Sequence, residues 1–338
     1  MNKDTIRIIG DLHIGKTMSH TTPASRKRFQ VLQDEVIKKA FDCDYPIFQL
    51  GDVFDKFEVN SSDFIRGLQT RGKSTGMLKG NHDYSNDTTL KSAFDNMSGF
   101  YKQDEIHSFS DASLKLKGVI TMISHQSNNA EFKKRLDEAY TTALEAGKKK
   151  LLLLHCNVGE KDEPEQLDNY LSTEMLNKLK EVYDLIITGH EHTYHEGKCV
   201  RVGAVLPYSF SEMQDKVVLD VNINTMEYEK KIVWSAQDNF KLATAKEFLH
   251  IRTPIQFCEV VGNIEREELL PLSKHISELL SQDGCIAIRN NTALPDVFSE
   301  GGSEVEACHA GWREIVSSRL PDDLRELFRR EVEDNANK

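Results

Sequence analysis

Short apolar runs, each followed by a turn, recur along the first two thirds of the chain. Five of these runs predict strands, at residues 5–9, 46–50, 76–79, 151–154 and 185–188. Between the first two, apolar side chains recur at helical spacing at Phe29, Leu32, Val36, Ile37 and Ala40. A second helix is expected near residues 62–72. Strands that alternate with helices indicate an α/β fold.

Each of the five predicted strands is followed by side chains that can bind a metal ion. The five endings read GDLHIG from Gly10, GDVFD from Gly51, GNHD from Gly80, a single His155, and GHEH from Gly189. One such ending would fit an ordinary turn, where Asp, Asn and Gly are favoured. Five in order predict a shared cluster, because open α/β folds gather their sites at the carboxyl ends of strands. Carboxylate oxygens beside imidazole nitrogens suit a divalent transition metal.

The last third of the chain has a different pattern. Residues 255–264 and 284–289 predict strands around a leucine-rich helical segment, in which Pro271 kinks or restarts the helix. Past the glycines at 301 and 302 come two short amphipathic stripes, led by Trp312 and Leu324. They predict a helical tail that needs a surface to fold against, because isolated short helices are marginal in water.

Composition indicates a globular protein of about two domains, with 338 residues, 39% hydrophobic and 29% charged. We expect a cytoplasmic protein, since no apolar run approaches a membrane span and the N-terminus is too polar for a signal peptide. The six cysteines form no C-x-x-C pair, which argues against a zinc finger or a disulfide framework. Charge is uneven: residues 1–40 hold eight basic against four acidic side chains, and residues 296–338 hold six against eleven.

The ordered motifs resemble those of the calcineurin-like metallophosphoesterase superfamily. The resemblance implies a sandwich of two β-sheets flanked by helices. It also implies two divalent metal ions: Asp11, His13, Asp52 and His192 would hold one, and Asp52, Asn81, His155 and His190 the other, with Asp52 bridging. Manganese is the expected ion, with Mg²⁺, Fe²⁺ and Zn²⁺ as alternatives. Two such ions can share a hydroxide for in-line attack on a phosphoester. By resemblance, His82 stabilises the transition state or protonates the leaving oxygen, and Asp55 orients it.

Within the superfamily, three features look like the SbcD-type nuclease subunit of double-strand-break repair. They are Gly15 after Ile14, the sequence GDVFD, and the segment VRVGAVLPYSFSE at residues 200–212. The serine/threonine protein phosphatases are disfavoured, because Lys56 follows Asp55 and the third motif ends in Asp83. Only 28 residues separate Asp52 from Asn81, which is short for the SbcD family. A homodimer is therefore one possible state of this protein, and the surface through which it would form is left open.

This resemblance implies three parts: a nuclease domain at residues 1–235, a small α/β capping domain at 236–300, and a helical partner-binding segment at 301–338. The expected partners are DNA and an SbcC-like coiled-coil ATPase, and no membrane. The basic first segment predicts a patch that follows the DNA phosphates, formed by Lys16, Arg26, Lys27 and Arg28.

We expect a metal-dependent DNA nuclease, the subunit of an SbcCD-like recombination or repair complex. One alternative is a stand-alone phosphatase or phosphodiesterase that acts on a small phosphoester. A non-catalytic binding module is disfavoured by the intact ligand set. His125 and His195 are left open as further residues of the cleft.

Overall fold

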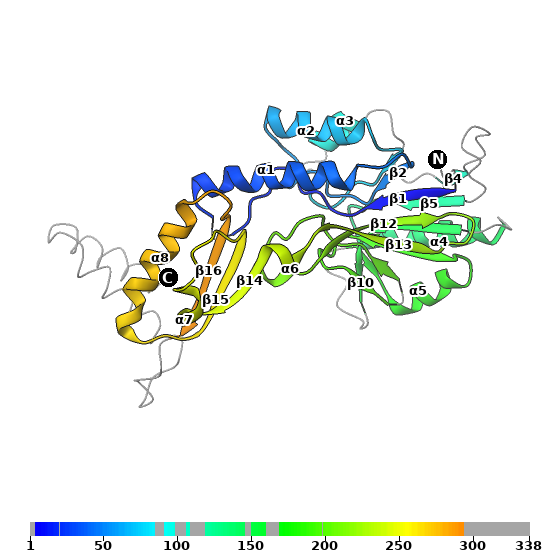
Figure 1. Ribbon diagram of the computed structural model, residues 1–338. Coiled ribbons are helices and arrows are strands. Elements are labelled where there is room, and N and C mark those ends of the chain that lie inside the picture. Colours follow the sequence, from blue (N-terminus) through cyan, green and yellow to red (C-terminus); the bar gives the residue numbers. More distant parts are fainter. Residues whose placement is uncertain are drawn as a thin grey trace, which may run out of the picture.

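The computed structural model describes residues 4–19, 21–84, 91–98, 106–108, 119–145, 150–159, 169–197 and 199–293. The predicted α/β fold is confirmed: two large sheets pack face to face and helices cover their outer faces (Figure 1). The predicted helical tail at 301–338 lies outside the described residues. No helix among the described residues is both long enough and apolar enough to cross a membrane.

The first sheet holds the three N-terminal predicted strands side by side. Its order is β13-β12-β1-β2-β3. The strands are β1 (Thr5–Ile9), β2 (Ile47–Gln49), β3 (Gly76–Met77), β12 (Lys216–Asn222) and β13 (Tyr228–Trp234). β1, β2 and β3 pair in parallel, so the loops that follow them leave from the same edge of the sheet.

The second sheet holds the two remaining predicted strands at its centre. Its order is β10-β11-β9-β6-β5-β4. The strands are β4 (Ile106–Ser108), β5 (Val119–Ile123), β6 (Lys150–His155), β9 (Leu185–Gly189), β10 (His195–Glu196) and β11 (Val200–Arg201). β6 and β9 pair in parallel, which places His155 opposite Gly189. A separate small sheet pairs β7 (Asn157–Val158) with β8 (Tyr170–Leu171).

Helices close the sandwich on both sides. They are α1 (Pro23–Ala40), α2 (Ser61–Arg71) and α3 (Ala93–Ser98) on the first sheet, and α4 (Asn129–Glu145) and α5 (Thr173–Lys180) on the second. The helix predicted from the spacing of Phe29 to Ala40 is α1. It begins at Pro23, after a capping box between Thr22 and Ser25. Its apolar stripe is buried against the first sheet.

A third sheet follows the sandwich and is parallel throughout. It consists of β14 (Phe240–Thr244), β15 (Phe257–Asn263) and β16 (Ala287–Ala293). Four short helical turns accompany it and the preceding chain: η1 (Phe210–Glu212), α6 (Ala236–Asn239), α7 (Ala245–Phe248) and η2 (Arg266–Glu268). Helix α8 (Leu269–Ser281) packs on one face of this sheet. Pro271 is the third residue of α8, where a missing N–H removes no helical hydrogen bond.

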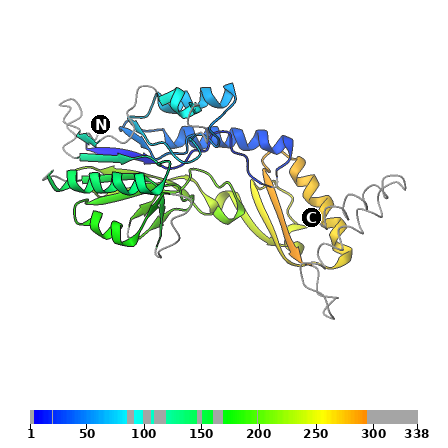
Figure 2. The same ribbon diagram turned by 180° about the vertical axis from the view of Figure 1, so that it is seen from behind.

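Helix α1 joins the third sheet to the sandwich, as the view from behind shows (Figure 2). Phe257 of β15 lies in the same apolar cluster as Phe29, with ring centroids 6.4 Å apart, and 5.8 Å from the ring of Trp234. Arg28 donates a 2.7 Å hydrogen bond to the carbonyl of Leu280, at the end of α8. The third sheet is therefore held to the sandwich by apolar and polar contacts.

Candidate metal centre

Five loops bring the predicted metal ligands together at one end of the sandwich. They follow β1, β2, β3, β6 and β9. Hydrogen bonds join them across large sequence separations: the N–H of His190 donates to the Asp11 carboxylate at 3.1 Å. His155 Nδ1 lies 2.7 Å from the carbonyl oxygen of Leu50. Residues from both sheets thus share one site.

The first group consists of Asp11, His13 and His192, whose nearest donor atoms all lie within 4.8 Å of one another. The Nε2 atoms of His13 and His192 are 2.8 Å apart. Asp52 Oδ2 lies 3.5 Å from His13 Nε2 and so adjoins this group. These are the four residues that the family resemblance assigned to one ion.

The second group consists of Asp52, His155 and His190, and their nearest ligand atoms again lie within 4.8 Å of one another. Asn81 adjoins it, with its Oδ1 3.1 Å from His155 Nε2 and 3.0 Å from His190 Nδ1. Asp52 Oδ2 lies 3.6 Å from His155 Nε2. Asp52 is therefore next to both groups, as a bridging ligand would be.

Burial makes this donor set unfavourable without a cation. Asp11, His13 and His155 are fully buried. Burial and the nearby Asp52 raise the pKa of Asp11, and burial lowers the pKa of His13 and brings that of His155 to about 4. The imidazoles of His13 and His155 are therefore neutral and offer lone pairs beside the carboxyl groups of Asp52 and Asp11. His155 donates Nδ1–H to a carbonyl and leaves Nε2 for a ligand, as metal-binding histidines do. The residues fit two divalent ions.

The backbone of the site is strained. His13, Asp52 and His190 adopt left-handed conformations, with φ of 44°, 49° and 85°. Only one other non-glycine residue in the described part of the chain, Met226, does so. Each such residue costs about 1–3 kcal/mol and persists where surrounding contacts hold it, commonly at functional sites. Gly80 also shapes the site, because an added Cβ would lie 2.0 Å from Asp52 Oδ1.

His82 lies beside these groups and is partly exposed. Its side chain is 36% exposed and its backbone N–H donates to Asp52 Oδ1 at 3.0 Å. His82 Nδ1 lies 2.7 Å from the main-chain carbonyl of Asp55, whereas the Asp55 carboxylate is 4.0 Å away. That carboxylate instead faces Lys16 Nζ at 3.4 Å. Asp55 thus contacts His82 through its backbone.

The four basic residues predicted to bind DNA have different surroundings. Lys16 pairs with Asp55 near the metal site. Arg26 and Lys27 are exposed on α1. Arg28 is mostly buried, bonded to Leu280 and 3.8 Å from Asp283. The structure therefore leaves Arg26 and Lys27 accessible and places Arg28 at the junction with α8.

The two histidines left open by the sequence also differ. The ring centroid of His125 lies 6.3 Å from that of His155, so His125 borders the site. His195 is exposed on β10.

Asp83 has a role that the sequence did not reveal. It is fully buried, and its carboxylate accepts N–H bonds from Val53, Phe54 and Gly80 at 3.0–3.2 Å. These bonds fasten the loop after β3 to the loop after β2. Burial and the nearby Asp52 raise the pKa of Asp83, while the three donors oppose this. The only sequence signal was its place in the GNHD motif.

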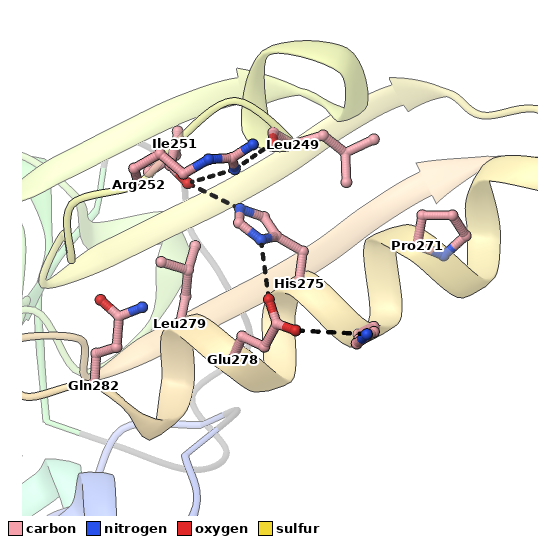
Figure 3. A pocket seen from close by; sticks show the side chains of 9 residues that line it. Leu249, Ile251, Arg252, Pro271, His275, Glu278, Leu279 and Gln282 are labelled. Atoms are coloured by element: carbon pink, nitrogen blue, oxygen red, sulfur yellow. Dashed lines mark hydrogen bonds and ion pairs between the residues drawn. The ribbon is translucent and has the colours of Figure 1, made fainter.

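A pocket of about 400 Å³ lies away from this centre, between the loop after α7 and helix α8 (Figure 3). Arg252 Nη1 donates to the carbonyl of Leu249 at 2.6 Å. Glu278 faces Lys274 and His275 at 3.9 and 3.7 Å. The Arg252 and Lys274 side chains of the pocket thus face a carbonyl and a carboxylate, which does not suit a phosphoester.

The five motif loops lie within the part of the chain that matches a known protein family. The model of the calcineurin-like phosphoesterase family matches residues 5–194, more than half of the chain. The chain belongs to this family. No significant similarity to a curated protein was found. Family membership and the two ligand groups identify a metal-dependent phosphoester hydrolase. The family match ends two residues after His192.

Proposed function

We propose that this phosphoesterase is a DNA nuclease, the nuclease subunit of an SbcCD-like recombination or repair complex. The observation that carries the proposal is the third sheet, which lies beyond the family match and is joined to the metal centre by α1. This helix has 18 residues and so spans about 27 Å. A surface of that length suits a polymeric substrate better than a small phosphoester.

Two further features support a nucleic-acid substrate. Arg26 and Lys27 are exposed on α1, next in sequence to Arg28, which contacts α8 beside the third sheet. The segment at residues 200–212 resembles its counterpart in SbcD-type nucleases. Phosphate contacts from basic side chains supply most of the sequence-independent affinity for DNA.

The residues of the centre divide the chemistry between them. Asp11, His13, Asp52 and His192 would hold one ion, and Asp52, Asn81, His155 and His190 the other. Bound divalent ions lower the pKa of water and offset charge on the phosphate. His82 is held through Nδ1 by the Asp55 carbonyl. When protonated, its ring presents Nε2–H to the phosphate or the leaving oxygen.

The test compares two substrates. The full chain is incubated with Mn²⁺ and either linear duplex DNA or p-nitrophenyl phosphate. The proposal predicts that DNA is cleaved at the higher kcat/KM. Hydrolysis of the small ester with intact DNA would instead identify a stand-alone phosphatase.

A further inference from the structure

Residues 203–216 follow the last predicted metal ligand and hold it at three points. We name them the clamp segment. The carboxylate of Glu212 accepts a hydrogen bond from His192 Nδ1–H at 3.1 Å. Lys216 Nζ and the N–H of Ala204 both donate to the carbonyl of His192, at 2.9 and 3.2 Å. The imidazole and the backbone of His192 are therefore both fixed by this segment.

The clamp segment also reaches the first metal motif. The hydroxyl of Tyr208 donates to the carbonyl of Leu12 and accepts from Gln33 Nε2 at 3.0 Å. Gln33 Nε2 also lies 3.0 Å from the carbonyl of His13. The ring of Tyr208 packs edge-on against His13 and His192, at 5.3 and 5.8 Å between centroids. Two ligands 179 residues apart in sequence thus share one support.

Glu212 decides which nitrogen of His192 carries the proton. Its carboxylate also accepts from the N–H of Tyr208 and the hydroxyl of Ser209, both at 3.0 Å. An ionised carboxylate only accepts hydrogen bonds, so it keeps the proton of His192 on Nδ1. Nε2 then presents its lone pair toward His13. A carboxylate behind a metal-binding histidine fixes its orientation and raises its basicity.

The second ligand group has a different support. His155 donates Nδ1–H to the neutral carbonyl of Leu50. Glu212 contacts His192 of the first group, and no hydrogen bond to a second-group residue is found for it in the described structure. The support from Glu212 is thus specific to one of the two groups.

We propose that Glu212 is a positioning residue for the ion held by Asp11, His13, Asp52 and His192, and that Tyr208 reinforces it. Both residues lie outside the part of the chain that matches the family. The inference rests on the metal-dependent hydrolysis proposed above but not on which phosphoester is cleaved.

The test measures Mn²⁺ binding to the full chain by titration calorimetry, without substrate. Glu212 accepts from His192 through Oε1 and from the N–H of Tyr208 through Oε2, so glutamine removes the charge and turns an NH₂ group toward one of these two donors. We expect one of two sites to weaken by about 10–100-fold while the other is unchanged. Glu229→Gln is the matched control, because Glu229 is exposed on β13.

Single-site backgrounds identify the affected ion. In His155→Ala, which retains the first group, Glu212→Gln should weaken the remaining site. In His192→Ala, which retains the second group, it should have no effect. Equal weakening in both backgrounds would indicate a general structural role and overturn the inference, as would wild-type affinities in Glu212→Gln.

A second variant keeps the inference testable if the first one misfolds. If Glu212→Gln does not fold, Tyr208→Phe decides the question in the same titration, because it keeps the ring and removes only the hydroxyl. It should weaken the first site alone, and two sites of wild-type affinity would overturn the inference. A wild-type chain that binds two ions without cleaving DNA would refute the nuclease proposal and leave this inference standing.

Discussion

At the scale of single residues, the metal centre combines strained backbone with buried charge. His13, Asp52 and His190 each adopt a positive φ in the loop that follows a strand. Their conformations are maintained by contacts from other loops, such as the hydrogen bond of the His13 N–H to the carbonyl of Asp52 at 2.8 Å. The assembled site therefore maintains these strained conformations, and each of the three residues depends on its neighbours.

His82→Ala tests whether His82 acts in the transition state without being a metal ligand. His82 lies outside the two predicted ligand sets, so we expect both metal ions to stay bound. Phosphoester cleavage should fall by about 10²–10⁴-fold, the usual contribution of a general acid or base. Rates and bound Mn²⁺ are measured on the same sample. Loss of an ion would instead make His82 a ligand, since His13, Asp52 and His82 also lie close enough to share one.

At the scale of elements, different faces of helix α1 pack against the core, contact the α8 helix beside the third sheet, and are exposed to solvent. Phe29 is buried, Arg28 contacts α8, and Arg26 and Lys27 are exposed. Neighbouring basic residues on one helix therefore have different surroundings, which the sequence pattern could not separate.

Replacing Arg26 and Lys27 together by alanine tests the DNA surface. Each lost phosphate contact reduces the slope of log binding constant against log salt concentration by about 0.9 for duplex DNA. The slope should therefore change by about 2. Binding is measured by fluorescence anisotropy across a salt series. An unchanged slope would make these residues an ordinary solvated face.

Arg28→Ala is the contrasting substitution on the same helix. It removes a hydrogen bond from a charged group to the Leu280 carbonyl, a contact worth about 1.5–3 kcal/mol. We expect a lower free energy of unfolding, measured in urea, with little change in the salt slope. A stable variant with a flattened slope would place Arg28 among the DNA contacts.

The ion pair of Arg7 and Asp220 joins β1 to β12 and is predicted to stabilise the first sheet. Arg7 Nε lies 2.7 Å from Asp220 Oδ1, and both side chains are buried. Arg7→Ala would leave a buried carboxylate without its partner, at a cost of about 3–5 kcal/mol in unfolding free energy. Lys178→Ala is the control, since its pair with Asp137 has the same 2.7 Å distance on the surface. Equal losses of unfolding free energy in the two variants would show that burial does not determine how much an ion pair stabilises this protein.

At the scale of the whole molecule, the family domain and the third sheet form one continuous apolar contact through Phe257 and α1. The chain after β16 carries an excess of acidic residues, six basic against eleven acidic over residues 296–338. Such a segment would repel DNA, and this favours a protein partner for it.

Truncation after Gly302 tests the proposed partner. We expect metal-dependent cleavage and the melting temperature to stay close to those of the full chain, because the described core ends before this point. Binding to an SbcC-like ATPase, measured by co-purification, should be lost. An insoluble truncation would mean that the two stripes led by Trp312 and Leu324 belong to the core of this protein.

The sequence by itself determined the fold class and the order of the five motif loops. Both follow from local chemistry: apolar runs form buried strands, and Asp, Asn and His at their ends are within reach of a shared site. The five motif strands recur as β1, β2, β3, β6 and β9 with ends shifted by up to two residues, and the helix near residues 62–72 recurs as α2. The helix predicted from Phe29 to Ala40 recurs as α1, which begins six residues earlier, at Pro23. The strands predicted at 255–264 and 284–289 recur as β15 and β16, with ends shifted by up to four residues. The ligand roles stay predictions.

Only the tertiary structure decided how these residues meet. Asp52 lies between the two groups because the two sheets pack with their strand ends together. Glu212 supports His192, Asp83 fastens two loops, and Arg28 faces α8 rather than solvent. These contacts join residues that are 20, 29 and 252 positions apart. No local pattern encodes such pairings, because they depend on where the packed core places each backbone segment.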